Sequence, residues 1–155
     1  MKQTKAVFTG SFDPFTLGHL DIVSRASVLC DRLYIAVGIN SQKVYQYSLE
    51  HRLQMIRAAT EHLDNIEVTS YDGLLTEFMH TIKAKLIVRG IRNTLDFEQE
   101  KTLYCTYKNL YPELEAIYLM ANNDLSHISS TVVKDLIRLK ADLTGYLPKQ
   151  VIDKK

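Results

Sequence analysis

The chain lacks the features that mark several large classes of protein. Its formal net charge is only +1, so it has no broad basic field of the kind that binds nucleic-acid duplexes or anionic membranes. No apolar run approaches membrane length, and the N-terminal stretch "MKQTKAVFTGSFDP" has no signal-peptide core, because Gly10 and Asp13 interrupt its short apolar run. We therefore expect a cytoplasmic protein with no nucleic-acid partner and no membrane partner, in which any anion is bound locally.

Cysteine is scarce, and histidine shows no metal-binding pattern. Cys30 and Cys105 are isolated in apolar-patterned helices and form neither a disulfide framework nor a CxxC pair. Buried free thiols in a reducing compartment are the prediction. His51, His62 and His80 fall in expected helices without metal-ligand spacing, so no role and no protein metal site is assigned to them.

Five short runs of branched apolar residues recur along the chain. They cover residues 5–9, 32–39, 65–70, 84–91 and 114–121, and their near-continuous hydrophobicity predicts strands covered on both faces. Helical patterns lie between and after them, at about 17–30, 49–63, 74–83, 95–111 and 131–140, and Pro148 could open a short terminal helix. Ser48 is the expected N-cap of the second helix, with Glu50 favourably placed in its first turn.

This alternation predicts the fold class. With 155 residues, 46% of them apolar, residues 1–155 fit one domain with a continuous core. Strand and helix alternating five times indicate an α/β, doubly wound, Rossmann-like domain: a five-stranded parallel sheet with helices on both faces. Ligands of such sheets bind beyond the carboxyl ends of the strands, so the loops after the strands are the candidate site.

The first of these loops carries the stretch "GSFDPFTLGH", residues 10–19. Gly10 would let the backbone approach a ligand closely, and Ser11 adds a hydroxyl. A helix that begins near Leu17 places His19 in its first turn, where free N–H groups and the helix dipole favour a phosphate, and a phosphate would favour the imidazolium. A simple turn followed by a surface histidine fits these residue types equally, and neither GxGxxG nor a Walker loop is present.

Three later loops carry further candidates for anion binding. Lys43 is the only cation between Arg32 and Arg52, which fits either a solvated surface or a phosphate site. Arg89 and Arg92 flank Gly90, and their guanidinium groups suit phosphate, although they could instead be surface arginines that pair with Asp96 or Glu98. Residues 129–131, Ser-Ser-Thr, precede an apolar-periodic helix, so one of them is either an ordinary N-cap or part of an anion site.

Three separated motifs resemble one known family. "GSFDPFTLGH" is similar to the G[ST]FDPxTxGH signature of the bacterial phosphopantetheine adenylyltransferases, members of the nucleotidylyltransferase superfamily marked by [HT]xGH, here Thr16 to His19. "VRGIRNTLDFEQE" resembles that family's RGxRxxxDFExE, and "LSHISST" resembles its [WY]S[FY]ISSS. The motifs occur in the family's order and spacing, and the resemblance extends from Lys5 to about Pro148.

The resemblance implies a role for each matching residue. It makes His19 the catalytic residue, which stabilises charge on the α-phosphate. It implies that the ATP site consists of Ser11, Phe12, His19, Gly90, Ile91, Arg92, Glu100, Leu125, Ser126, His127, Ile128, Ser129, Ser130 and Thr131. It also implies that Ser11, Lys43, Leu75 and Arg89 bind the acceptor substrate. It also implies a homohexamer built as a dimer of trimers.

The chain departs from the family pattern in two of these loops. The family usually continues Lys-Lys-Pro where this chain has Lys43-Val44-Tyr45, which bears on the shape of the loop more than on its charge. Leu125 replaces a large aromatic residue and His127 replaces Phe or Tyr, so packing near the adenine is expected to differ.

The implied reaction is attack of the 4′-phosphopantetheine phosphate on the α-phosphorus of ATP, which yields dephospho-coenzyme A and pyrophosphate. No GxSxG elbow is present and neither cysteine falls in an expected loop, so a covalent enzyme intermediate is not expected. The chemistry implies Mg²⁺ as cofactor. A nicotinate-mononucleotide adenylyltransferase, a glycerol-phosphate cytidylyltransferase and a non-catalytic ATP sensor on the same fold are the alternatives.

Overall fold

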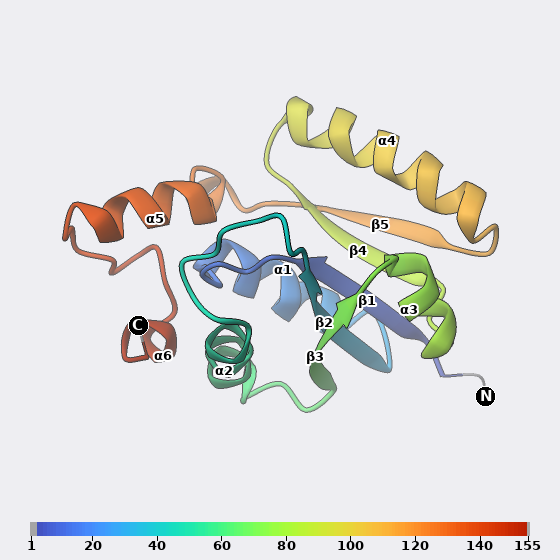
Figure 1. Cartoon of the computed structure of the whole chain (residues 1–155), viewed down its shortest axis with the longest axis horizontal. Coiled ribbons are helices and arrows are strands. Elements are labelled where there is room, and N and C mark those ends of the chain that lie inside the picture. Colours follow the sequence, from blue (N-terminus) through green and yellow to red (C-terminus); the bar gives the residue numbers. More distant parts are fainter. Residues whose placement is uncertain (1–2, 155) are drawn as a thin grey trace.

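The computed structural model describes residues 3–154, and its centre is one parallel sheet. The strands are β1 (Lys5–Gly10), β2 (Arg32–Ile39), β3 (Ile66–Asp72), β4 (Leu86–Ile91) and β5 (Glu115–Met120). They pair in the order β3-β2-β1-β4-β5, all parallel, as Figure 1 shows. The prediction of a five-stranded, doubly wound parallel sheet is confirmed.

Helices alternate with the strands, as the sequence predicts. They are α1 (Leu17–Ser27), α2 (Leu49–Thr60), α3 (Leu75–Thr81), α4 (Thr94–Leu110), α5 (Ser130–Arg138) and α6 (Lys149–Ile152), with a short 3-10 turn, η1 (Asn123–Leu125). Ser48 caps α2 by accepting the backbone N–H of His51 at 3.2 Å, which confirms the expected cap. The first two helices end about three residues earlier than expected, at Ser27 and Thr60.

Two apolar layers cover the two faces of the sheet. Alternate residues of β1 point to opposite faces, so Phe8 joins the layer that α1 and α2 cover, while Val7 joins the layer that α3 and α4 cover. The same alternation separates Ile35 from Tyr34 on β2. Helices therefore pack on both faces, and the strands β1 and β2 at the centre are almost fully buried.

The outer elements are less buried than the sequence predicts. Strands β3 and β5, at the two edges of the sheet, are only partly covered, because each has a neighbouring strand on one side only. Helix α4 has no buried residue, so Cys105 on it is exposed, and Cys30 lies just beyond the end of α1 and is partly buried. The prediction of two buried helical thiols was therefore wrong, although both cysteines are free.

The carboxyl ends of the strands form the edge where functional residues gather. Figure 1 shows α5 and α6 on this side of the molecule. Gly90, near the end of β4, allows close packing on α1, because a Cβ there would lie 3.0 Å from Cγ1 of Ile22. Across residues 3–154, the helices are all too short or too polar to cross a membrane.

Candidate active site

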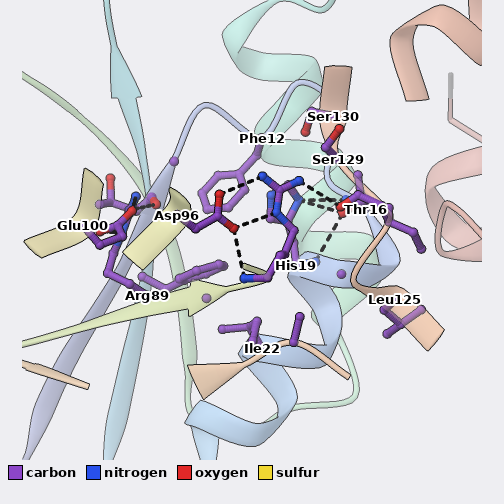
Figure 2. A pocket seen from close by; sticks show the side chains of 18 of the residues that line it. Phe12, Thr16, His19, Ile22, Arg89, Asp96, Glu100, Leu125, Ser129 and Ser130 are labelled. Atoms are coloured by element: carbon purple, nitrogen blue, oxygen red, sulfur yellow. Dashed lines mark hydrogen bonds and ion pairs between the residues drawn. The ribbon is translucent and has the colours of Figure 1, made fainter. Parts of the chain in front are cut away.

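A cavity of about 330 Å³ opens at this edge of the sheet. The loop after β1, the start of α1, the end of β4, the first turns of α4 and the segment from η1 to α5 all contribute to its walls (Figure 2). Its lining residues are Phe8, Thr9, Gly10, Phe12, Thr16, Gly18, His19, Ile22, Arg89, Gly90, Arg92, Asp96, Gln99, Glu100, Ala121, Leu125, Ile128, Ser129 and Ser130. It lies where the topology of the sheet predicts a ligand site.

His19 is held at the N-terminus of α1 by a capping box. Thr16 is the N-cap, and its Oγ1 accepts the backbone N–H of His19 at 3.3 Å. In return the backbone N–H of Thr16 donates to Nδ1 of His19 at 3.0 Å, and Thr16 Oγ1 lies 3.1 Å from the same nitrogen. Because a backbone N–H can only donate, Nδ1 is the acceptor and Nε2 carries the proton of the neutral ring. The Nε2–H group remains available to a ligand in the cavity.

Aromatic rings surround His19. Phe15 stacks on it with ring centroids 5.4 Å apart, and Phe12 meets it edge-on at 5.0 Å. Phe12 has a left-handed backbone with φ of 47°, which a bulky residue adopts only where its surroundings hold it, and its ring is 3% exposed. The unusual backbone turns the chain between β1 and α1 while the ring of Phe12 stays under the histidine.

This environment keeps His19 neutral. Burial among the rings, followed by the positive charges of Arg92 and Arg89, lowers the pKa of His19 to about 4. The backbone N–H of Thr16 acts in the same direction, because a proton on Nδ1 would face this donor. The sequence favoured an imidazolium beside phosphate, whereas this geometry presents a neutral imidazole whose Nε2–H is a hydrogen-bond donor.

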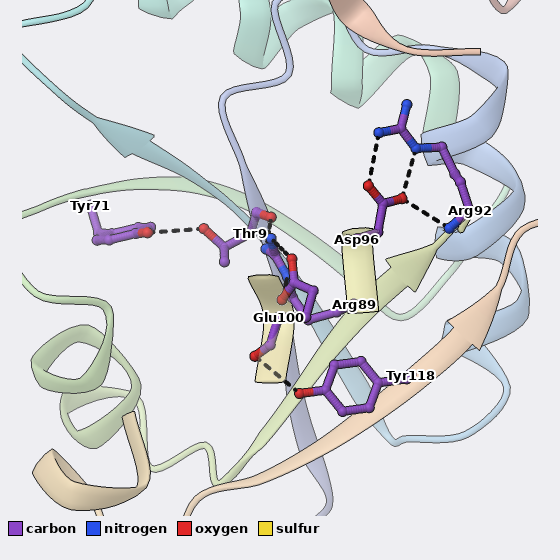
Figure 3. A network of polar contacts seen from close by, with 7 residues as sticks. All are labelled: Thr9, Tyr71, Arg89, Arg92, Asp96, Glu100 and Tyr118. Atoms are coloured by element: carbon purple, nitrogen blue, oxygen red, sulfur yellow. Dashed lines mark hydrogen bonds and ion pairs between the residues drawn. The ribbon is translucent and has the colours of Figure 1, made fainter. Parts of the chain in front are cut away.

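Arg89 belongs to a polar network that joins β1, β3, β4, β5 and α4 (Figure 3). Its Nε and NH2 groups donate to both carboxylate oxygens of Glu100 on α4, at 2.8 and 2.6 Å. Its NH1 group donates to the carbonyl oxygen of Thr9 at 2.7 Å, and the hydroxyl of Thr9 contacts that of Tyr71 at 3.0 Å. Arg89 is therefore fixed in place at the end of β1, with two N–H donors left over.

Arg92 is paired with Asp96, as the alternative interpretation of the sequence anticipated. The Asp96 carboxylate accepts from the backbone N–H and Nε of Arg92, each at 3.0 Å, and from NH2 at 3.2 Å. Burial would raise the pKa of Asp96, but the hydrogen bonds and charge of Arg92, with the charge of Arg89, outweigh it and hold that pKa below its usual value. Since both residues line the cavity, the ion pair faces a ligand there.

The N-terminus of α5 closes the cavity on the side opposite Arg89, as Figure 2 shows. Ser129 is the N-cap, and its Oγ accepts the backbone N–H of Val132 at 3.2 Å. Ser130 donates from Oγ to the carbonyl oxygen of Pro14 at 2.9 Å, which ties α5 to the loop after β1. The sequence left open which of residues 129–131 caps the helix, and the structure assigns that role to Ser129.

Most residues that the family resemblance assigns to ATP meet in this one cavity. They are Phe12, His19, Gly90, Arg92, Glu100, Leu125, Ile128, Ser129 and Ser130, and Arg89 from the acceptor set joins them. Residues far apart in the sequence thus converge on one space, although their roles toward ATP stay predictions.

The other predicted residues lie outside the cavity. They are Ser11, Lys43, Leu75, Ile91, Ser126, His127 and Thr131. Lys43 is exposed in the loop after β2, whereas Leu75 is buried in the apolar layer on the α3 side of the sheet. His127 is exposed and contacts the ring of Tyr146 edge-on at 5.7 Å.

Sequence reasoning gave no role to several lining residues. They are Phe8, Thr9, Thr16, Gly18, Ile22, Asp96, Gln99 and Ala121. Phe8 and Thr9 could have been found, because they end the strand that precedes the signature loop. Ile22 and Gln99 could not have been found in this way, because they lie within helices and line the cavity only through the side of the helix on which they stand. In residues 3–154 we find no cluster of three or more His, Cys, Asp or Glu side chains that could hold a metal ion.

The fold and the cavity together define a nucleotide-binding α/β domain, and known proteins agree. The sequence model of the cytidylyltransferase-like family matches residues 7–136. A solved structure described as a putative nicotinate-nucleotide adenylyltransferase from Vibrio parahaemolyticus superimposes with a TM-score of 0.71 over 98% of this chain and 91% of its own, at 15% identity, which supports the fold.

Curated relatives narrow the class. The phosphopantetheine adenylyltransferase of Staphylococcus haemolyticus is 42% identical over 97% of this chain and 94% of its own length. That of Nautilia profundicola is 40% identical over 96% of this chain and 97% of its own, and that of Heliobacterium modesticaldum is 40% identical over 96% and 89%. The chain belongs to the phosphopantetheine adenylyltransferase family.

The neutral state of His19 predicts a specific pH dependence of stability. The unfolded chain binds a proton at His19 near pH 6.5, whereas the folded chain does so only near pH 4, so folding stability falls as the pH is lowered between these values. This one residue accounts for up to about 3 kcal/mol of that loss. His19→Gln should flatten the slope of the urea-unfolding free energy between pH 6.5 and pH 4.5.

The matched control is His62→Gln, which changes an exposed histidine and should retain the wild-type slope. Equal slopes for His19→Gln and the wild-type chain would contradict a neutral His19 in the folded chain.

Proposed function

We propose that this chain transfers the adenylyl group of ATP to 4′-phosphopantetheine by direct in-line displacement, releasing pyrophosphate and dephospho-coenzyme A. The observation that carries the proposal is the convergence of His19, Arg92 and the serine-capped N-terminus of α5 on one cavity, in a chain of this family. These groups are hydrogen-bond donors and cations, which suit a triphosphate.

His19 acts as a fixed donor to the reacting phosphate in this proposal. Its Nε2–H donates to an α-phosphate oxygen, where negative charge develops in the transition state. Because Thr16 and the phenylalanine rings already hold the imidazole, no reorganisation is needed at the moment of reaction. A neutral donor also avoids a proton-transfer step, so His19 contributes electrostatic stabilisation and not acid–base catalysis.

The triphosphate is assigned to Arg92 and to the segment that leads into α5. Arg92 would exchange the carboxylate of Asp96 for phosphate oxygens, and Ser129 and Ser130 stand at a helix N-terminus that favours anions. The family resemblance also assigns to the nucleotide Phe12, Gly90, Glu100, Leu125 and Ile128, which line the cavity, and Ser11, Ile91, Ser126, His127 and Thr131, which lie outside it.

The acceptor is assigned to Ser11, Lys43, Leu75 and Arg89. A phosphate monoester has a second pKa near ~6, so the acceptor is largely dianionic at neutral pH and needs no general base. Lys43 and Arg89 would hold this dianion beside the α-phosphorus. The nucleophilic oxygen forms the new P–O bond while the bond from the α-phosphorus to pyrophosphate breaks, and pyrophosphate leaves with the electron pair.

Magnesium enters this proposal with the nucleotide. The carboxylates that line the cavity are Asp96 and Glu100, and each is already paired with an arginine. Mg²⁺ commonly keeps several waters and binds through substrate phosphates, so Mg²⁺–ATP is the substrate we propose. We further propose a cytoplasmic location, which the two free cysteines support.

A choice of acceptors tests the activity. The chain, given ATP and Mg²⁺, should release pyrophosphate with 4′-phosphopantetheine and not with nicotinate mononucleotide or glycerol 3-phosphate. Turnover only with one of the other acceptors would replace the proposed substrate. ATP binding without pyrophosphate release on any of the three would favour a nucleotide sensor.

Replacing His19 tests its role in the transition state. We expect His19→Ala to lower kcat by ~10²-fold or more with little change in ATP affinity, because the proposed hydrogen bond strengthens chiefly as charge develops. Steady-state kinetics and calorimetric titration with ATP provide the two quantities. His62→Ala, an exposed histidine, is the control, and near-normal kcat for His19→Ala would remove His19 from the mechanism.

The assembly we propose is a homohexamer, a dimer of trimers, and α4 offers a surface for it. Large apolar side chains are exposed along this helix, including Leu95, Leu103 and Leu110, at 75%, 39% and 54%. Sedimentation should give the mass of six copies of the 17.8-kDa chain. Leu103→Lys should shift the mass toward smaller species, whereas Asn109→Lys, on an exposed polar position of α4, should not. A monomeric wild-type chain would refute the assembly.

A further inference from the structure

The loop that carries Lys43 is tied to the signature loop by Asp13. The carboxylate of Asp13 is buried, with the residue 3% exposed, and accepts the backbone N–H groups of Gln46 at 2.8 Å and Tyr47 at 2.9 Å. These two bonds hold the end of the Lys43 loop against the turn between β1 and α1. On the other side of Lys43, its own backbone N–H donates to the carbonyl of Asn40 at 3.1 Å.

Arg52 of α2 makes a second connection between the same two loops. It is 3% exposed, and its NH1 group donates to the carbonyl oxygen of Ser11 at 2.8 Å. Its guanidinium carbon also lies 4.0 Å from the centre of the Tyr45 ring. One buried cation therefore touches the turn at Ser11 and the loop at Tyr45.

Tyr45 stands at a position where this chain departs from its family pattern. The pattern continues Lys-Lys-Pro, whereas this chain has Lys43-Val44-Tyr45. A proline at this position would restrict the backbone through its ring, which fixes φ. Tyr45 instead holds the loop through the contact of its side chain with Arg52. The Tyr45 hydroxyl is buried and has no hydrogen-bond partner within residues 3–154, so the ring carries the interaction. Its neighbour Val44 is 97% exposed and contributes no such anchor.

We propose that Tyr45, stacked on Arg52, is a positioning residue that holds Lys43 in place for the phosphate of the acceptor. The inference rests on the proposed function, because Lys43 is assigned to that phosphate there. Lys43 itself is exposed, so no packing of its own side chain fixes its position. Its charge can meet the acceptor phosphate at a defined place only if the loop is held on both sides of Lys43. The carbonyl of Asn40, directly after β2, holds the loop before Lys43, and Asp13 and Arg52 hold it after Lys43.

Kinetics separate positioning from simple folding. We expect Tyr45→Ala to raise the KM for 4′-phosphopantetheine about fivefold while the KM for ATP and kcat stay close to wild type. Tyr45→Phe should behave as wild type, because the ring is kept and the hydroxyl has no partner. Gln46→Ala is the control, since its side chain is exposed and the N–H that Asp13 accepts remains. An unchanged acceptor KM, or Tyr45→Phe failing like Tyr45→Ala, would overturn the proposal.

Limited proteolysis gives a reading that does not depend on activity. Trypsin cleaves after lysine, so the rate of cleavage between Lys43 and Val44, followed by mass spectrometry, reports the order of this loop. Cleavage should be several-fold faster in Tyr45→Ala than in wild type, Tyr45→Phe and Gln46→Ala, at equal thermal stability. Equal cleavage rates would overturn the loop contact. A different result is also informative: Tyr45→Ala is cleaved faster, but the wild-type chain does not turn over 4′-phosphopantetheine. That result would support the loop contact and refute the proposed substrate.

Discussion

The hydrogen bond from the backbone N–H of Thr16 to Nδ1 of His19 is the constraint on which the site depends. It starts α1 at Leu17, because Thr16 and His19 cap the helix reciprocally. It also sets the ring orientation and its tautomer, and it opposes protonation at Nδ1. One residue pair thus links helix formation, the geometry of the cavity and the chemical state of the group that faces a ligand.

Around this pair, the two arginines of the cavity differ in how freely they can act. Arg89 uses three of its five N–H groups on Glu100 and Thr9, and its side chain is 23% exposed. It can offer only its two remaining donors, from a fixed place. Arg92, just before α4, donates to Asp96 in the first turn of that helix and to the carbonyl of Ile128 at 3.4 Å, and its side chain is 37% exposed. An ion pair of that exposure contributes little to stability, so Arg92 changes partners more easily than Arg89 does.

The sequence predicts the sheet and the edge that carries the site because both depend on local patterns. The apolar runs specify β1 and β2, and the order of strands and helices indicates that the loops after the strands converge. Exposure of the edge strands and of α4 could not be predicted, since an apolar pattern does not show whether another element covers it. The exposed position of Cys105 follows from the same limit.

Side-chain partners were harder to predict than the positions of the motifs. Motif spacing brings Arg92 and Ser129 to the cavity, but the pairing of Arg89 with Glu100 depends on the angle at which α4 leaves β4. The chemical state of His19 depends on Phe12 and Phe15 packing around it, and no single residue type in "GSFDPFTLGH" shows that packing. Burial therefore decided the charge of the central residue, where the helix N-terminus alone suggested an imidazolium.

The buried carboxylate of Asp13 holds the neighbouring loop through backbone groups. Asp13 binds the backbone N–H groups of Gln46 and Tyr47, so neither of these two bonds needs a particular side chain on the loop. A loop attached in this way keeps its ends in place when intervening residues change. The contact between Tyr45 and Arg52 is then an addition to that attachment, made through the side chain at the position where the family pattern has proline.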